Sequence, residues 1–385
     1  MRFVLLPLMT LLLAFAALAP AATVSTLDGR TIQGPGITFD PKAGTVTAGS
    51  TSVALADCDW IEPHTGVGVV VTGTPAKRMG VWLADGSWLP VARITVAKSD
   101  DAIAVDGPLG PLMLPLAALR GWGDGVDLLP APEGAAERDV ALLASGAVPG
   151  RVEGIKAGQL ILRSDLDPTK PLELPLADVR ALRLAVPARA AKGVRLAVSL
   201  DDLHPPLRVV ATAAGLALAA APTVALGDAL RLARLRVEGG RRVHLGELKP
   251  AVVEEVGAFG VVWPFQVDHN LDGSPLRLGG VRYERGVVVH SQARLAWKLS
   301  GAYVRLRAQV GIADLVGEQG DCAATLRLDG KPAWSKDSVK GGDKPISLDL
   351  DLTGVQQMEL SVEYGARYDI GDHLALADAY LVKAK

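Results

Sequence analysis

Cysteine is scarce in this chain of 385 residues, which has only Cys58 and Cys322. The two lie in segments that the sequence pattern assigns to different domains, so neither has a partner for an intradomain disulfide. Neither stands in a Cys-x-x-Cys type of metal spacing, and isolated cysteines are usually small buried hydrophobes. We therefore assign no function to either thiol.

An excess of charge of one sign is also lacking. The chain has 40 Lys and Arg against 42 Asp and Glu, for a formal net charge of −2. A polyanion is normally bound by a strongly basic patch or stripe. Nucleic acid is therefore excluded as an expected partner.

The common catalytic motifs are missing from the sequence. There is no Gly-x-Ser-x-Gly elbow, His-Glu-x-x-His pair, Gly-rich phosphate loop or Cys-His pair. Carboxylate pairs such as Glu254-Glu255 and Asp201-Asp202 are adjacent in sequence. Adjacent side chains in an extended chain point to opposite sides, so these pairs do not flank one glycosidic bond. We expect a protein that is not an enzyme.

Long hydrophobic runs are limited to the N-terminus. A basic second residue precedes an apolar run over residues 3–18, which is followed by small residues. This layout is typical of a secretory signal peptide, and an Ala-x-Ala pattern at Ala19 and Ala21 favours cleavage after Ala21 or Ala22. The run is shorter than the roughly 20 residues that span a bilayer. We expect residues 1–22 to be removed and the protein to be exported, without a stable membrane span, to a periplasm, cell surface or extracellular medium.

Residues 23–248 show a weak internal repeat at a spacing of roughly 60 residues. A first phrase occurs at Leu27-Asp28-Gly29-Arg30, Leu83-Ala84-Asp85-Gly86, Leu143-Ala144-Ser145-Gly146 and Leu200-Asp201-Asp202-Leu203. A second, apolar phrase follows at Val53–Asp57, Leu114–Leu119 and Leu174–Val179, with a degraded copy around Val224–Leu235.

The stretches between these phrases predict short strands. Runs such as Ile94–Val96, Ala102–Val105 and Gln159–Leu162 are bounded by Gly, Pro and Asp. We expect each repeat to form a small antiparallel β-roll or barrel, and one continuous β-sandwich is the alternative. The predicted domains are residues 23–130 with repeats 1 and 2, and 140–248 with repeats 3 and 4, joined by a polar linker.

The C-terminal third, residues 250–385, has a different composition. Ten of the 17 aromatic residues lie at or beyond Phe259, including all five tyrosines. Apolar and polar residues alternate over segments that predict half-buried strands: Tyr303–Val310, Leu326–Leu328, Leu348–Leu352, Met358–Tyr364 and Ala379–Val382. The Asp329-Gly330 step predicts a tight turn into a further strand. Seven or eight such strands without a long helix indicate a two-sheet jelly roll.

Several phrases of this third occur in the order and spacing of a known family. They are Gly280-Val281-Arg282-Tyr283-Glu284-Arg285-Gly286, Val289-His290-Ser291, Tyr303–Ile312, Leu328-Asp329-Gly330-Lys331, Asp369-Ile370-Gly371-Asp372-His373 and Ala379-Tyr380-Leu381. Residues 250–383 resemble the NPCBM family of carbohydrate-binding modules, which are often found beside glycoside hydrolase domains. The resemblance implies a galactose-binding-like jelly-roll β-sandwich that recognises a glycan. The chain departs from the family at Leu374-Ala375-Leu376, where an acidic residue and a tryptophan are common.

Sugar sites pair an aromatic face with a few fixed polar groups. The aromatic candidates are Tyr283, Trp297, Trp334 and Tyr368, for which core packing is the alternative role. The polar candidates are His290, Asp372 and His373, which stand at family motif positions. Tying loops together is the alternative role of the two histidines.

One segment resembles the start of a calcium loop. Asp268, Asn270 and Asp272 occupy alternate positions before Gly273, as in the Asp-x-Asn-x-Asp-Gly motif. The twelfth position is Gly279 instead of glutamate, so an ordinary polar turn is the alternative. A second acidic group, Asp369, Asp372 and Asp378, is also open to a turn-capping role. Structural calcium is thus a candidate, and no other cofactor is expected.

These features favour an exported, non-catalytic protein that binds a polysaccharide or other glycan through its C-terminal jelly roll. An alternative is a structural or adhesive protein of the cell envelope that contacts other envelope proteins and has no sugar site. A third hypothesis, an accessory to an undetected hydrolase, requires converging acids in the repeats. The repeats contain few histidines, tryptophans and charged pairs, which argues against it.

Overall fold

The computed structural model describes residues 22–62, 79–124, 138–186, 193–200, 204–227 and 234–385. Residues 1–21 of the expected signal peptide and most of the expected linker lie outside these residues. The regular elements within them are β-strands and short 3-10 helices, which confirms the all-β prediction. No helix in this described part is both long enough and apolar enough to cross a membrane.

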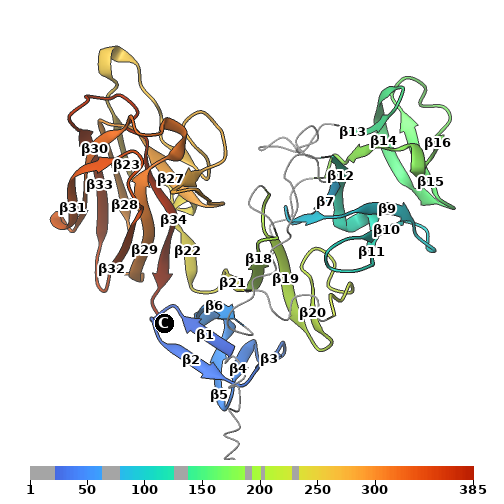
Figure 1. Ribbon diagram of the computed structural model, residues 1–385, viewed down its shortest axis with the longest axis horizontal. Helices are drawn as coiled ribbons and strands as arrows, with labels where there is room; N and C mark the ends of the chain where they lie inside the picture. Colours follow the sequence, from blue (N-terminus) through green and yellow to red (C-terminus); the bar gives the residue numbers. More distant parts are fainter. Residues whose placement is uncertain (1–21, 63–78, 125–137, 187–192, 201–203, 228–233) are drawn as a thin grey trace, which may run out of the picture.

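A seven-stranded sheet forms the central unit (Figure 1). Its strands, in spatial order, are β2 (Thr31–Gly34), β1 (Ala22–Thr26), β6 (Cys58–Glu62), β21 (Leu235–Glu238), β18 (Arg195–Val198), β19 (Leu207–Thr212) and β20 (Gly215–Leu218). A small sheet of β3 (Ile37–Asp40), β4 (Thr45–Ala48) and β5 (Thr51–Ala54) lies beside it. Strands of the first and fourth predicted repeats therefore share one sheet, joined where β6 pairs with β21.

An eight-stranded sheet combines the second and third predicted repeats. Its order is β16 (Leu172–Pro175), β15 (Gln159–Ser164), β14 (Gly146–Lys156), β13 (Asp139–Leu143), β17 (Ala181–Arg183), β12 (Leu119–Asp124), β7 (Met79–Leu83) and β8 (Trp88–Pro90). A three-stranded sheet of β9 (Arg93–Val96), β10 (Ala102–Asp106) and β11 (Leu112–Pro115) accompanies it. The domain limits proposed from the sequence stay a prediction.

The recurring phrases adopt recurring local structures. Gly29 and Gly86 of the first phrase have φ of +89° and +81°, values that favour glycine, in the turns after β1 and β7. The second phrase forms 3-10 turns at η1 (Leu55–Asp57), η2 (Leu116–Ala118) and η4 (Leu176–Asp178). A further such turn occurs at η5 (Leu245–Glu247), downstream of the predicted fourth copy. The similarity among the repeated phrases therefore reflects the similar turns that they form between strands.

The C-terminal part is a jelly-roll β-sandwich of two antiparallel sheets, as predicted. One sheet has the order β24 (Gln266–Val267), β27 (Gly286–Val289), β34 (Leu374–Lys383), β29 (Tyr303–Ile312) and β32 (Ile346–Asp351), with β22 (Arg242–His244) also paired to β34. The other has the order β23 (Val252–Glu255), β28 (Ala293–Lys298), β33 (Gln357–Tyr364), β30 (Asp321–Leu328) and β31 (Lys331–Lys340). A hairpin of β25 (Arg277–Leu278) and β26 (Val281–Arg282) covers part of the first sheet.

Side-chain alternation explains how the sandwich closes. Leu306, Ala308 and Val310 of β29 face the core, whereas the residues between them face outward. Asp329 and Gly330 both have positive φ in the turn between β30 and β31, as the Asp-Gly step predicts. Cys58 and Cys322 are buried free thiols.

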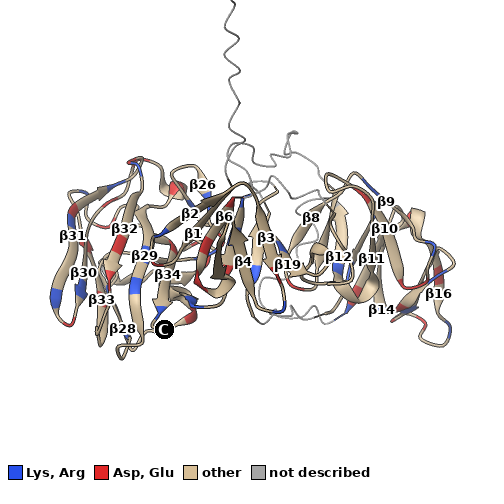
Figure 2. Cartoon of the chain, turned by 90° about the horizontal axis from the view of Figure 1, so that it is seen from below, with Lys and Arg blue, Asp and Glu red and all other residues tan. Residues whose placement is uncertain are grey.

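The central unit is joined to the sandwich through a short connection and an apolar contact. The chain passes from β21 to β22 through Gly239 and Gly240. Leu27 of the central unit packs with Tyr380 and Val382 of β34. The sandwich lies at one end, with the eight-stranded sheet at the other (Figure 2).

Gly240→Ala is expected to destabilise this junction. Gly240 has a φ of +65°, and an added Cβ would lie 2.7 Å from the Cα of Ala56. Strain of this kind costs about 1–3 kcal/mol. Gly227→Ala is the matched control, because Gly227 has a φ of +55° with no atom within 4 Å of an added Cβ. Urea denaturation should show a larger loss for Gly240→Ala, and equal losses would contradict a tight contact with Ala56.

Candidate ligand-binding site

Three aromatic side chains meet at one end of the sandwich. The ring of His290 lies 5.6 Å from that of His373 in an edge-on arrangement. The indole of Trp263 lies 6.3 Å from His290 and 6.2 Å from His373, measured between ring centroids. Trp263 is 44% exposed, whereas His290 is buried and His373 is half-buried. We name Trp263, His290 and His373 the loop-end cluster.

Each member of the loop-end cluster stands beside a strand that fixes its position. His290 follows the last residue of β27, and His373 precedes the first residue of β34. Trp263 lies in the connection between β23 and β24, which is held at both ends. The amide of Val256 donates to the Gln292 carbonyl at 2.9 Å, and the amide of Phe265 donates to the Glu255 carboxylate at 2.5 Å.

The fully buried Asp372 carboxylate ties the loops beneath the loop-end cluster together. It accepts a hydrogen bond from the Ser291 hydroxyl at 2.6 Å and one from the Asp321 amide at 3.1 Å. Burial raises the pKa of Asp372. Asp372 adjoins His373, and Ser291 adjoins His290. The hydrogen bonds of Asp372 therefore fix the positions of the two imidazoles relative to each other. Asp372 therefore positions the two histidines and does not present its own carboxylate to a ligand at the surface.

The two imidazoles offer complementary hydrogen-bonding atoms. His290 Nδ1 lies 2.6 Å from the Ser291 carbonyl, and because a carbonyl only accepts, Nδ1 carries a proton; in the neutral imidazole Nε2 is then an acceptor. His373 Nδ1 is buried with no hydrogen-bond partner among the described residues. Placing the His373 proton on Nε2 avoids a buried N–H without an acceptor. The pair then presents one acceptor and one donor, which suits hydroxyl groups.

His373 is expected to make stability depend on pH. Burial, with a smaller contribution from His290, lowers the pKa of His373 from 6.5 to about 4, and Asp272 opposes this. As pH falls from 6.5 to 4, the unfolded chain gains a proton at this residue that the folded chain does not, so stability falls.

Thermal denaturation of the wild type and of His373→Gln between pH 7 and 4 measures this effect. The variant should lose less stability over that window. His244, whose pKa burial lowers to about 2, remains in both proteins and cancels in the comparison. Parallel curves for the two proteins would contradict the assignment to His373.

The aromatic residues predicted from the sequence are dispersed. Trp297 is 1% exposed in the core, and its Nε1 donates to the Leu248 carbonyl at 3.2 Å, which gives it a packing role. Trp334 is half-buried on β31, packed against the core. Tyr283 packs on the small apolar cluster under the β25–β26 hairpin. Tyr368 is 76% exposed in the connection before His373.

The predicted calcium residues make contacts within the chain. Asp268 accepts from Arg285 Nη1 at 2.8 Å, and Asn270 Nδ2 donates to the Ser274 hydroxyl and the Pro275 carbonyl. Asp272 accepts from the Ser274 amide at 2.9 Å. In the described part of the chain, no group of three or more His, Cys, Asp or Glu side chains is arranged to hold a metal ion. These contacts are those of a polar turn, and the calcium site stays a prediction.

Trp263 is the residue that the sequence reasoning missed. It follows a Gly-Val-Val run and precedes Pro264, in a segment without strand or helix periodicity. An isolated tryptophan in an irregular segment is the signal that could have identified it. The segment directly after His373 lacks the tryptophan that is common in the family. Trp263, which comes from a different loop, places an aromatic ring beside His373.

An exposed indole flanked by fixed donors and acceptors can stack on the apolar face of a pyranose and bind its hydroxyls. A jelly-roll sandwich with such a group at its loop end has the layout of a carbohydrate-binding module. Residues 213–382 match the profile of the NPCBM/NEW2 domain, so the C-terminal portion of the chain carries this domain. The match associates this portion with carbohydrate binding.

Individual relatives are distant. A Renibacterium salmoninarum protein named as an endo-alpha-N-acetylgalactosaminidase is 28% identical over 91 residues, which is 24% of this chain and 6% of the relative. A CBM51 module of Clostridium perfringens, solved with methyl-galactose, is 20% identical and covers 37% of this chain and 99% of its own, with a TM-score of 0.34. Tandem CBM51 modules of a Streptococcus pneumoniae family 98 glycoside hydrolase are 12% identical, covering 80% and 88%, with a TM-score of 0.33. The strand order above, and not this likeness, defines the fold.

Proposed function

We propose that this protein is an exported, non-catalytic carbohydrate-binding protein that recognises a glycan through the loop-end cluster. The observation that carries the proposal is the exposed indole of Trp263 beside the edge-on pair of His290 and His373. An indole provides a flat apolar surface, and the two imidazoles provide an acceptor and a donor for hydroxyl groups. The signal-peptide pattern of the first 22 residues supports export.

The non-catalytic part of the proposal rests on the chemistry of the site. The carboxylate nearest to the histidines in sequence, Asp372, is fully buried and engaged by Ser291 and Asp321. Glycoside hydrolysis commonly requires two carboxylates facing one bond at separations of about 5 to 10 Å. Because Asp372 is withdrawn from the surface and already engaged, its contacts support recognition over cleavage at this site.

A second candidate function is protein contact at the cell envelope. Several exposed apolar side chains lie in loops of the sandwich: Val256, Val261, Val262, Leu315 and Ile370. Exposed apolar patches often mark contact surfaces. Under this alternative the loop end would bind another envelope protein and no saccharide.

The experiment is a glycan array probed with the full mature chain, in calcium buffer and again in chelator. The proposal predicts binding of at least one glycan class, lost in His373→Ala and retained in Trp334→Ala, whose tryptophan lies on β31. Binding lost only in chelator would support a structural calcium ion near Asp268, Asn270 and Asp272. A folded protein that binds no glycan would overturn the proposal in favour of protein contact.

A further inference from the structure

Two adjoining hollows lie between the sandwich and the central unit. One has a volume of about 490 Å³ and the other of about 290 Å³, and both are lined by Asp349 of β32. Their floor is the outward face of β29 and β32, and their opposite wall contains Leu27, Asp28, Asp59 and Trp60. We name the two hollows together the junction cleft. Its size falls within the range of about 300 to 1,000 Å³ typical of ligand pockets.

The floor of the junction cleft is a row of fixed polar groups. Alternation along β29 and β32 directs Arg305, Arg307, Gln309, Ser347 and Asp349 outward, away from the sandwich core. Arg305 Nη2 donates to Asp349 Oδ2 at 2.9 Å, and the Ser347 hydroxyl donates to Gln309 Oε1 at 3.1 Å. Both signs of charge are visible along these strands (Figure 2). Such paired groups offer donors and acceptors at defined positions without rearrangement.

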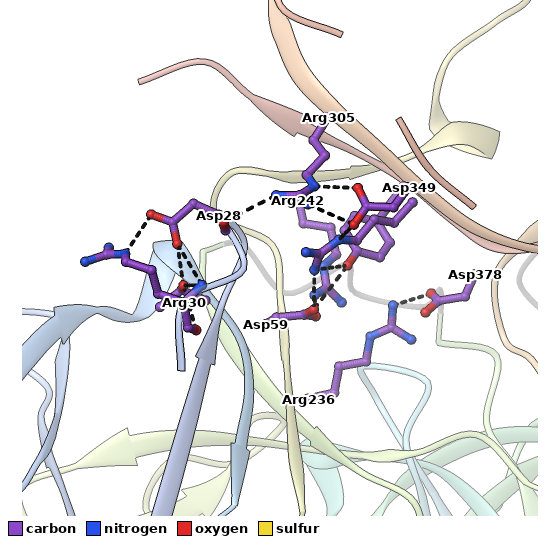
Figure 3. Close-up of polar contacts among 11 residues, drawn as sticks. Asp28, Arg30, Asp59, Arg236, Arg242, Arg305, Asp349 and Asp378 are labelled. Atoms are coloured by element: carbon purple, nitrogen blue, oxygen red, sulfur yellow. Dashed lines mark hydrogen bonds and ion pairs between the residues drawn. The ribbon is translucent and has the colours of Figure 1, made fainter. Parts of the chain in front are cut away.

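The charges of the lining disfavour an anionic ligand. Among the residues that the structure describes, the lining contains five carboxylates, of Asp28, Asp59, Asp349, Asp351 and Asp378, and three guanidiniums, of Arg241, Arg305 and Arg307. The guanidiniums are already paired with carboxylates of the chain (Figure 3 shows the Arg305 pair). A sulfated or uronic-acid sugar would meet no surplus positive charge. A neutral, hydroxyl-rich ligand suits these groups.

One wall of the cleft provides an aromatic surface. Trp60 of β6 is half-buried and lines the smaller hollow. The guanidiniums of Arg234 and Arg236 lie 4.0 Å and 5.6 Å from the centroid of its ring, and these cation–π contacts hold the indole in place. The part of the indole that lines the hollow is an apolar surface against which a pyranose ring can pack.

The junction cleft is separate from the loop-end cluster. Leu278 of the β25–β26 hairpin packs beside Gly311, so the hairpin covers the outward face of β29 between the two places. The two hollows also follow one another along β29, from Arg305 to Gln309, which suits an extended ligand. We propose that the junction cleft is a second saccharide-binding site, for an internal stretch of a neutral oligosaccharide. Two sites on one chain raise the avidity for a polysaccharide.

Isothermal titration calorimetry of the full mature chain tests the proposal with neutral hexasaccharides of galactose, glucose and mannose. Trp263→Ala removes binding at the loop end, and Ser347→Trp fills the cleft from its floor. Ser335→Trp is the matched control, because Ser335 is exposed on β31 of the other sheet. In the Trp263→Ala background, one hexasaccharide should still bind, and Ser347→Trp should weaken it at least tenfold while Ser335→Trp leaves it unchanged.

The outcomes separate this proposal from the proposed function. If Trp263→Ala alone abolishes hexasaccharide binding, the second site is overturned and the loop-end site stands. If Trp263→Ala has no effect and Ser347→Trp abolishes binding, the second site stands and the loop-end site fails. Binding that survives both changes, or binding of uronic-acid oligosaccharides in place of neutral ones, would overturn the second site.

Discussion

Asp59→Ala is expected to lower the free energy of unfolding by about 3–5 kcal/mol, because it leaves the buried guanidinium of Arg242 without its carboxylate. Asp59 of β6 is 8% exposed and accepts from Arg242, from Arg307 Nη1 at 2.9 Å and from the Tyr380 hydroxyl at 3.2 Å. The side chain of Arg242 is only 1% exposed, and burial already lowers its pKa. Figure 3 shows Asp59 within this group. The residue therefore binds the central unit to three strands of the sandwich.

Urea denaturation, followed by circular dichroism and by limited proteolysis, measures the effect of Asp59→Ala. Asp106→Ala is the control, because its 2.6 Å pair with Arg93 is solvent-exposed, and such pairs contribute about 0–1 kcal/mol. Proteolysis of the Asp59 variant should begin between the central unit and the sandwich. Equal small losses for the two variants would show that the junction does not depend on Asp59.

Trp263→Ala is expected to weaken glycan binding by at least tenfold, which is about 1.4 kcal/mol. The indole is the most exposed member of the loop-end cluster and gives the apolar surface on which a sugar ring would stack. Because Trp263 lies in a loop and outside the sandwich core, the free energy of unfolding should change little. Affinity is measured by titration calorimetry with the glycan class identified on the array.

Two variants control for this prediction. Trp334→Ala removes a tryptophan from β31 and should leave affinity unchanged, and Trp263→Phe keeps an aromatic face and should retain most of it. Unaltered affinity in Trp263→Ala would place the sugar elsewhere on the chain. A fall in affinity that accompanies unfolding would be visible in the melting temperature measured in parallel.

The strands of the sandwich could be predicted because their side chains alternate along the sequence. The segments Tyr303–Ile312 and Gln357–Tyr364 are strands in the structure, and His290 and His373 stand at strand ends that motif spacing marks. Alternation identifies the faces of a strand but does not identify its neighbour. The pairing of β6 with β21, and hence the place of Asp59 at the junction, required the structure.

Of the loop-end cluster, the two histidines could be predicted from the sequence and Trp263 could not. Its histidines lie next to strands, whereas Trp263 lies in an irregular connection whose path depends on the anchoring of Val256 and Phe265. Trp297 and Trp334 have the same residue type but lie in or against the core, and only three-dimensional packing separates these roles. Residue type indicates the chemistry, and exposure decides which tryptophan is available for binding.

The most direct test of the proposed function is an NMR titration of the full mature chain with ¹⁵N-labelled tryptophan side chains. The seven indole N–H signals are assigned by substitution, and the glycan identified on the array is then added. The account predicts a saturable shift of the Trp263 signal while that of the buried Trp297 stays in place. Saturable glycan binding without a shift of Trp263 would contradict the loop-end cluster as the site of recognition.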